Sequence, residues 1–310
     1  PMAIFFPLFT LLEDLGYLPR VAFNLDGLMA RCGAHGRQSL TMCMSLGCNA
    51  CGVTGCRIID SPRERLTAQL TASLVPCNGR LPTLLVLLSL FFLGNSSGPG
   101  RSLLEAALFL LAVLFSVVMS MAASGLLSHT LLRGTPSSFS LELPPYRLPR
   151  VGQVLVRSLL DRTVFVLGRA VLVAAPAGAI LWLCSHIRVG TVPVLSLLSS
   201  ILEPIGQLMG LDGLILLAFL LAFPANELLL PILAMGYQAA ETMTAVETPQ
   251  LGLLLVSHGW TWRTALYAMV LCLFHLPCGT TCLTLLRETG SRRWTAAGML
   301  LPLAMGAALC

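Results

Sequence analysis

The chain alternates between long apolar runs and short polar stretches. One uninterrupted run, Ser102–Ser128, holds a single acid, Glu105. It is long enough to span the ~30 Å hydrocarbon core of a membrane. Gly168–Ile187 is a second run of this kind, with Arg169 at its edge. Both runs predict membrane-spanning helices, so we expect the chain to cross a membrane more than once.

Four short polar breaks interrupt other apolar runs, two in each half of the chain: Gly47–Gly52, Pro76–Pro82, Pro224–Glu227 and Pro277–Cys282. Irregular backbone at membrane depth is tolerated only where it is buried in protein or lines a cavity. Paired breaks in the two halves of a chain point to a transport site. The pattern therefore predicts an all-α polytopic membrane protein with broken or re-entrant helices in both halves.

The segments between these runs complete the prediction. Arg20–Gly36 reads as an amphipathic helix, Val192–Met209 as a helix at the membrane interface and Arg287–Arg293 as a charged loop. Pro62 marks a helix start after a polar loop. The proline-rich stretch from Arg133 to Arg150 is the clearest linker, and a basic interfacial helix follows it at 151–169. We divide the chain into a first half (1–132), a linker with its interfacial helix (133–167) and a second half (168–310).

Composition supports the membrane assignment and excludes several functions. Hydrophobic residues make up 56% and charged residues 11%, against about 25% charged residues in soluble domains. The net charge of +5 comes from arginine alone, because the chain has no lysine. A phosphate-binding loop needs Gly-Lys-Ser/Thr, and neither a Ser/His/Asp order nor an HExxH pattern is present. We expect no enzymatic activity in this chain. No basic stripe with interleaved aromatics predicts nucleic-acid binding.

Eleven cysteines are present, and Cys48, Cys51 and Cys56 form the densest group. Thiolates suit first-row transition metals, so transient metal contact along a pathway is one interpretation. Small residues chosen for close helix packing are another. A structural zinc site would need further ligands, for which Cys43 and His35 are candidates. A thioredoxin-type dithiol would need a βαβ context, which the pattern lacks.

The two Pro-Cys breaks carry the remaining candidate ligands. Cys77 and Asn78 lie in the first, with Arg80 nearby, and Cys278 and Cys282 lie in the second, four residues apart as on one face of a helix. Glu227 is an acid inside an apolar run, and such a residue is a functional candidate by default. An ion pair with an arginine is the alternative for Glu227. His275, just before the second Pro-Cys pair, reads more readily as a packed, hydrogen-bonded residue than as a ligand.

Several motifs occur together in one order along the chain. They are Phe6-Pro7-Leu8-Phe9, Leu12–Phe23, Gly47-Cys48-Asn49, Pro76-Cys77 with Arg80-Leu81-Pro82, Leu141–Arg147 and Arg287–Ser291. This ordered set resembles the membrane core of the FeoB ferrous iron transporters of bacteria. The resemblance implies two "Gate" segments related to nucleoside-recognition membrane domains. It also implies a multi-pass location in the cytoplasmic (inner) membrane and an N-terminal GTP-binding domain in the full protein, outside this chain. The opening membrane helix of the family is also expected to lie outside it.

The chain departs from the family pattern at two places. Many members have Gly-Cys-Asn-Val-Pro where this chain has Gly47-Cys48-Asn49-Ala50-Cys51, so Cys51 and Cys56 make the first gate richer in cysteine. In the second gate many members have Ala-Lys-Glu where this chain has Ala225-Asn226-Glu227. The change removes a lysine that could pair with Glu227.

We therefore predict an Fe²⁺ permease core with two gate-type halves and a path lined by thiolates and carbonyls between them. The expected metal-contacting residues are Cys48, Asn49, Cys51, Cys77, Asn78, Glu227, Cys278 and Cys282. No resident cofactor is expected, since Fe²⁺ is the transported ion. The expected partners are Fe²⁺, the lipid bilayer and the GTP-binding domain, with homo-oligomer formation left open and nucleic acid excluded. The alternatives are a carrier for nucleosides or other small organic solutes, and a membrane module without transport.

Overall fold

The computed structural model describes residues 7–12, 15–93, 99–132, 187–189, 192–238 and 248–310, with isolated positions between 152 and 183. The predicted linker lies outside the described residues. The predicted interfacial helix at 151–169 and the predicted span Gly168–Ile187 lie almost wholly outside them. These predictions stay as they stand.

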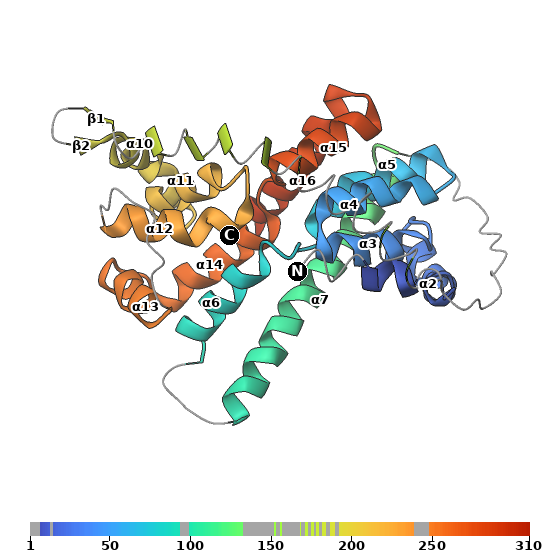
Figure 1. Cartoon of the computed structure of the whole chain (residues 1–310), viewed down its shortest axis with the longest axis horizontal. Coiled ribbons are helices and arrows are strands. Elements are labelled where there is room, and N and C mark those ends of the chain that lie inside the picture. Colours follow the sequence, from blue (N-terminus) through green and yellow to red (C-terminus); the bar gives the residue numbers. More distant parts are fainter. Residues whose placement is uncertain are drawn as a thin grey trace. The chain divides into compact units, whose positions relative to one another are not determined.

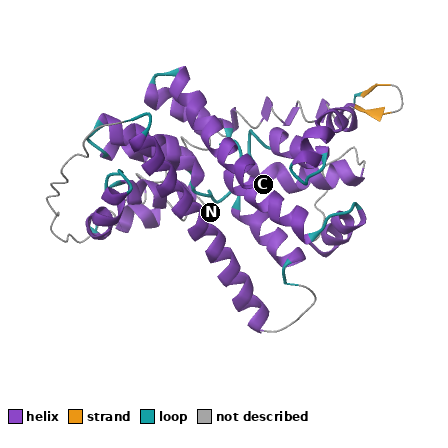
Figure 2. Cartoon of the chain, turned by 180° about the vertical axis from the view of Figure 1, so that it is seen from behind, coloured by secondary structure: helices purple, strands orange, loops and turns teal. Residues whose placement is uncertain are grey.

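Helices make up nearly all of the described structure (Figures 1 and 2). The first part of the chain contains α2 (Tyr17–Arg31), α3 (Gln38–Gly47), α4 (Asn49–Gly55), η1 (Cys56–Ile58), α5 (Pro62–Thr71), η2 (Ala72–Leu74), α6 (Leu81–Phe91) and α7 (Pro99–His129). The second part contains β1 (Arg188–Val189), β2 (Val192–Pro193), α10 (Val194–Leu208), α11 (Gly213–Leu221), η4 (Asn226–Leu228), α12 (Leu229–Gln238), α13 (Thr248–Ser257), α14 (Trp262–Phe274), α15 (Gly279–Thr289) and α16 (Arg292–Leu309). The all-α prediction is confirmed, with one two-residue antiparallel hairpin, β1–β2, as the exception.

Two helical segments are long and apolar enough to cross a membrane among the described residues. They are Gly100–His129 within α7, and Trp262–Thr289, which includes the break between α14 and α15. A third span is counted if α10 and α11, which bend by 110° at their junction, act as one broken or re-entrant element. The predicted span Ser102–Ser128 is confirmed. Val192–Met209, predicted as an interfacial helix, forms the first arm of this bent pair.

The structure places breaks where the sequence predicts them. α3 and α4 are separated by Cys48, and the helical segment α5–η2 is separated from α6 by 75–80. α11 ends before Pro224, and α14 and α15 are separated by 275–278. The prediction of a charged loop over Arg287–Arg293 is wrong in extent. Arg287 lies in the last turn of α15 and Arg292 opens α16, because Gly290 (φ 62°) turns the chain in a left-handed conformation that ends the helix at once.

Contacts divide the chain into two compact units, each built from three stretches. Unit 1 comprises Pro1–Asn78, Leu114–Val171 and Thr280–Leu301, and unit 2 comprises Gly79–Val113, Leu172–Gly279 and Pro302–Cys310. The boundaries fall inside α7 and α16, so single helices contribute to both units. The sequence halves describe a repeat relationship, which stays a prediction.

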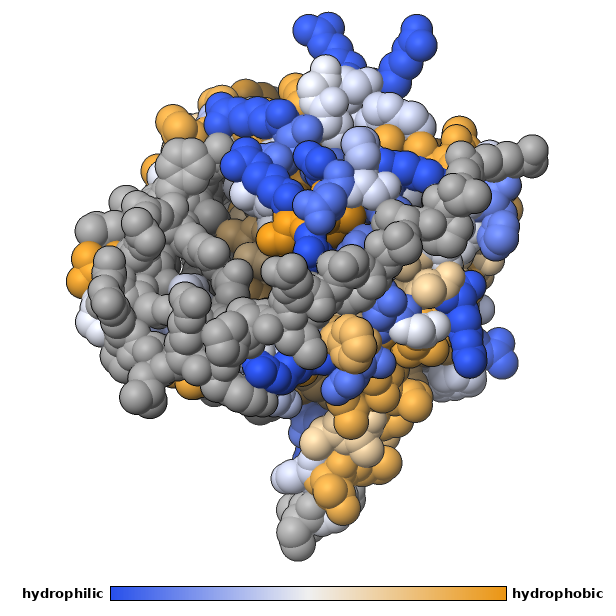
Figure 3. Space-filling view, turned by 90° about the vertical axis from the view of Figure 1, so that its right-hand side faces the viewer, coloured by the Kyte–Doolittle hydropathy of each residue, from blue (hydrophilic) through white to orange (hydrophobic). Residues whose placement is uncertain are grey.

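Side chains of α7 have opposite characters on opposite faces. Its outer face is apolar, as the orange surface along its length in Figure 3 shows, with Leu103 73% and Leu111 66% exposed. Its buried face in unit 1 carries serines four residues apart, at 116, 120, 124 and 128. Ser120 and Ser124 bond to Thr71 at the end of α5, and Gln38 of α3 donates to both Thr71 and Ser124. An apolar lipid-facing side and a hydroxyl-bearing inner side fit a membrane helix packed on one face.

Carboxylates hold the sharp bend of unit 2. Asp212 accepts the backbone N–H of Ile215 at 2.8 Å and so caps the start of α11. Glu203 accepts the N–H of Gly213 at 2.7 Å. Tyr237 donates its hydroxyl proton to Asp212 and accepts a hydrogen bond from the Trp260 indole at 2.8 Å. These bonds fix α10, α11 and α12 into one arrangement beside the third break.

Candidate functional site

The first break in unit 1 is a single extended residue between two short helices. Cys48 (φ −159°, ψ 123°) ends α3 and begins α4. The two helices can pack closely because Gly52 has no side chain: a Cβ there would lie 1.8 Å from the hydroxyl oxygen of Ser45. This geometry turns the chain sharply and leaves Asn49 at the start of the second helix.

Asn49 joins the first break to the second. It is 2% exposed, and with its amide oriented to satisfy the surrounding acceptors it donates to the carbonyl oxygens of Ser45 (3.0 Å) and Val75 (3.1 Å). Val75 directly precedes Pro76 and Cys77. Unit 1 therefore brings together two breaks that lie apart in the sequence, as the transport interpretation expects.

The thiols of this region are inside the protein. Cys48, Cys51 and Cys77 are each 7–8% exposed and Cys56 is fully buried. The ten described cysteines are free thiols. The hydrogen bond with Cys51, together with burial, raises the pKa of Cys48 well above its usual value. In the absence of metal this group is therefore a thiol, and metal binding as a thiolate would release its proton.

The structure gives no support to a closed zinc site. Among the described residues no three His, Cys, Asp or Glu side chains come together in a group that could hold a metal ion. Of the further ligands considered, Cys43 is exposed, whereas Cys48, Cys51 and Cys56 are buried. His35 accepts the backbone N–H of Arg37 at its Nδ1. Burial lowers the pKa of His35, which favours the neutral ring that this bond requires.

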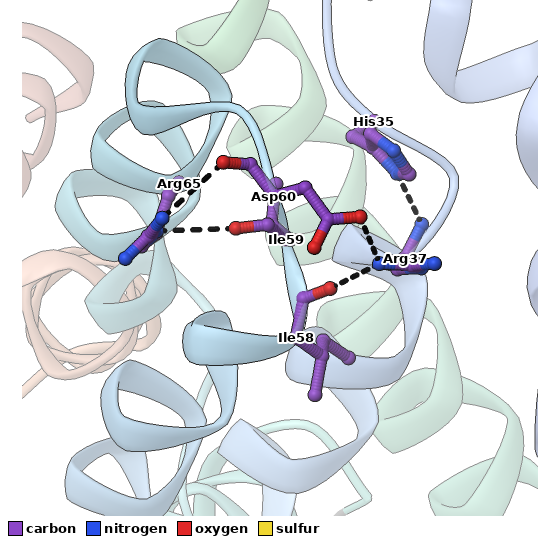
Figure 4. A network of polar contacts seen from close by, with 6 residues as sticks. All are labelled: His35, Arg37, Ile58, Ile59, Asp60 and Arg65. Carbon is purple, nitrogen blue, oxygen red and sulfur yellow. Dashed lines mark hydrogen bonds and ion pairs between the residues drawn. The ribbon is translucent and has the colours of Figure 1, made fainter. Parts of the chain in front are cut away.

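Figure 4 shows how arginines fix the loop before α5. Arg37 donates to the Ile58 carbonyl at 2.5 Å and to Asp60 at 2.7 Å, while Arg65 donates to the Ile59 carbonyl at 3.1 Å. Asp60 is largely exposed, so its ion pair contributes little by itself. The carbonyl contacts hold the loop that positions α5.

The third and fourth breaks meet within unit 2. His275, 3% exposed, lies at the end of α14, and its Nε2 is 3.1 Å from the Oδ1 of Asn226. The N–H of Gly279 donates to the Phe223 carbonyl at 2.8 Å. A side-chain contact and a backbone bond thus tie Pro224–Glu227 to the segment that holds Pro277 and Cys278.

A fully buried arginine closes the end of α14. Arg80 donates to the carbonyl oxygens of Leu273 (2.7 Å), His275 (3.2 Å) and Leu276 (3.3 Å). The last carbonyls of a helix lack intrahelical partners, so the guanidinium fork supplies the missing donors. These oxygens, predicted from the sequence to face an ion, already have hydrogen-bond donors.

Glu227 lies beside Gly79 and is exposed at the surface of this chain. A Cβ at Gly79 would lie 3.4 Å from the Glu227 Cγ and 3.7 Å from the Asn226 Cβ. The glycine therefore allows the 226–227 segment to approach the chain next to Arg80. Of the other predicted residues, Asn78 is half-buried, Cys278 precedes the first residue of α15, and Cys282 is buried within that helix.

Both asparagines follow the same kind of backbone break. Cys48 before Asn49 and Ala225 before Asn226 (φ −150°, ψ 117°) are extended, and a helix starts immediately after each. Each asparagine then contacts a residue one or two positions before a Pro-Cys pair, Val75 or His275. This likeness supports the weak internal symmetry read from the sequence, with a thiol at position 48 and a methyl group at position 225.

Sequence reasoning missed two features of the site. Arg80 was noted only as a neighbour of Cys77, because nothing in the sequence reveals that its partners lie 193 to 196 residues away. The asparagine of the second gate was treated as a lost lysine, and its contact with His275 was not anticipated. The four-residue spacing of serines in α7 was visible in the sequence and would have marked its buried face.

Interrupted helices joined in pairs, on a chain with several apolar spans, define a polytopic α-helical membrane protein of the gate type. Two family models match the chain. The Gate model, described as nucleoside recognition, matches residues 1–91, and the model of the ferrous iron transport protein B C terminus matches residues 109–161. No solved structure matches.

Curated relatives carry one shared name. The Fe(2+) transporter FeoB of Staphylococcus aureus (strain MSSA476) is 27% identical over 97% of this chain and 44% of its own length. The protein of that name from Synechocystis sp. is 27% identical over 97% of this chain and 47% of its own length. The one from Salmonella typhimurium is 34% identical over 53% and 20%. The chain belongs to the FeoB family, and it spans less than half the length of these relatives.

Proposed function

We propose that this chain forms part of the passage by which Fe²⁺ crosses the bacterial inner membrane. The observation that carries the proposal is the pairing of breaks, Asn49 with Val75 in unit 1 and Asn226 with His275 in unit 2, inside a chain of apolar helices. Such breaks bring polar groups to membrane depth, where helices otherwise offer an ion only hydrocarbon. The relatives' name, Fe(2+) transporter, supports iron as the ion.

The thiols are the proposed ligands along this passage. Cys48 and Cys51 flank the first break, and Cys77 and Cys278 follow the prolines of the two Pro-Cys breaks. Thiolate suits Fe²⁺ better than it suits Mg²⁺ or Ca²⁺. Because several carbonyls of the breaks already accept hydrogen bonds, sulfur and side-chain oxygen are the better candidates. Incomplete ligation suits transport, since the ion must leave each site.

The whole protein is proposed to carry a GTP-binding domain in addition to this chain, because the relatives are more than twice as long as the part matched here. Transport by an organic-solute carrier of the same architecture is the weaker alternative. The word nucleoside in the Gate description is its support, whereas every curated relative reported above is named for Fe²⁺.

Iron uptake by cells that depend on the full-length protein tests the thiol ligands. We expect Cys77→Ser and Cys278→Ser each to reduce Fe²⁺ uptake by about 10-fold or more, the usual range for disturbing a metal site. Cys43→Ser is the matched control, because Cys43 is an exposed thiol on α3. Uptake that stays at the wild-type level in both variants, at equal protein abundance, would rule out the thiolate path.

A further inference from the structure

His275 lies in an unusual place for a histidine, deep inside an apolar helical segment. Its ring is 3% exposed and packs against Phe219, with ring centroids 5.2 Å apart. Nδ1 lies 3.0 Å from the carbonyl oxygen of Cys272. A carbonyl only accepts, so Nδ1 carries the proton of this bond. In the neutral ring, Nε2 then holds a lone pair.

That lone pair is directed toward the third break. The Asn226 amide lies against Nε2, with Oδ1 3.1 Å away, and Asn226 is itself 7% exposed. Histidines that bind metals almost always donate their other ring N–H to a carbonyl, carboxylate or water, which fixes the ring and its tautomer. His275 has this arrangement before any metal binds.

We propose that His275 Nε2 and the side-chain oxygen of Asn226 are a ligand pair for the transported divalent metal. This inference rests on the proposed function. Two neighbouring ligands about 2.1 Å from a metal, at right angles, are about 3.0 Å apart. The observed 3.1 Å separation therefore matches such a pair. Imidazole suits Fe²⁺, and it adds a nitrogen donor that the cysteines do not provide.

The surrounding charges fit a site that holds a cation briefly. Glu227 follows Asn226 directly and approaches Gly79, so a carboxylate is available next to the pair. The guanidinium of Arg80 is directed at the carbonyls of Leu273, His275 and Leu276, at the end of α14. The pair supplies two protein ligands, and water completes the coordination. Such an open site releases its ion more readily than a closed cage.

Pulsed electron paramagnetic resonance on the purified full-length protein, loaded with less than one equivalent of Cu²⁺, tests the pair. Modulation from the remote imidazole nitrogen reports a bound histidine. We expect this signal in the wild type and its loss in His275→Gln. His258→Gln is the matched control, because the Nδ1 of His258 also lies near a helix carbonyl, 2.9 Å from Leu254 O, but its ring is exposed. Persistence of the nitrogen signal in folded His275→Gln overturns the proposal.

A second variant keeps the test decisive if His275→Gln fails to fold. Asn226→Asp replaces an amide oxygen with a carboxylate oxygen of the same size, so the pair predicts about 10-fold tighter Co²⁺ binding, whereas unchanged affinity contradicts it. Fe²⁺ uptake separates this proposal from the proposed function. Wild-type uptake that His275→Gln leaves intact removes the pair but keeps iron transport. A nitrogen signal in a wild type that moves no iron keeps the pair as a metal site and removes iron transport.

Discussion

Replacing Arg80 tests how the breaks of unit 2 are held. In Arg80→Met the carbonyls of Leu273, His275 and Leu276 lose their donor. Each buried carbonyl left without a partner costs about 1–3 kcal/mol. Removing a fully buried charge recovers part of this, because that charge no longer has to be desolvated. We expect a net loss of about 3 kcal/mol in the free energy of unfolding.

Arg80→Lys separates the charge from the shape of the side chain. Lysine keeps the charge, but a compact ammonium cannot reproduce a planar fork bonded to three carbonyls, so we expect a loss of about 1–2 kcal/mol. A thiol-reactive fluorophore that reports thermal unfolding suits the measurement, since Cys272 is buried and its sulfur lies 3.9 Å from the Arg80 carbonyl. Arg263→Met, at an exposed arginine above the Trp262 ring, is the control and should change stability by less than about 0.5 kcal/mol. An Arg80→Met protein as stable as this control would refute the helix-end role.

Three further changes address unit 1. Gly52→Ala should destabilise it by about 1–3 kcal/mol, because the new methyl group meets Ser45, and adding Ser45→Gly should restore most of the loss in a double-mutant cycle. Asn49→Leu removes the donor to Val75 and should cost about 1–3 kcal/mol; an unchanged unfolding temperature would contradict the link between the two breaks. Arg57→Gln breaks a two-bond ion pair with Glu288 (2.7 and 2.8 Å), but Arg57 is 67% exposed, so a chemical unfolding curve should shift by less than about 1 kcal/mol.

The positions of the breaks could be predicted from the sequence because their causes are local. Proline prevents helix at Pro76, Pro224 and Pro277, and Pro62 begins α5 as expected. The span in α7 follows from its length and apolar composition. Local chemistry therefore fixes where helices start and stop, and this part of the prediction is confirmed.

The pairing of breaks could not be predicted, because it depends on contacts between distant parts of the chain. Arg80 reaches carbonyls at the end of α14, and Asn226 reaches His275, 49 residues further on. A sequence shows that such groups are polar and buried in apolar surroundings, but not which of them meet. For the same reason the carbonyls expected to be open to an ion could not be recognised as acceptors for Arg80 and Asn49.

The central claim, that this chain carries Fe²⁺ across a membrane, is tested most directly by flux into sealed vesicles. The full-length protein would be reconstituted into liposomes and given radioactive Fe²⁺ or a radioactive nucleoside under reducing conditions. The account predicts that Fe²⁺ accumulates inside above the level of protein-free vesicles, that unlabelled Fe²⁺ competes with it, and that the nucleoside stays outside. Accumulation of the nucleoside with no entry of Fe²⁺ would contradict it.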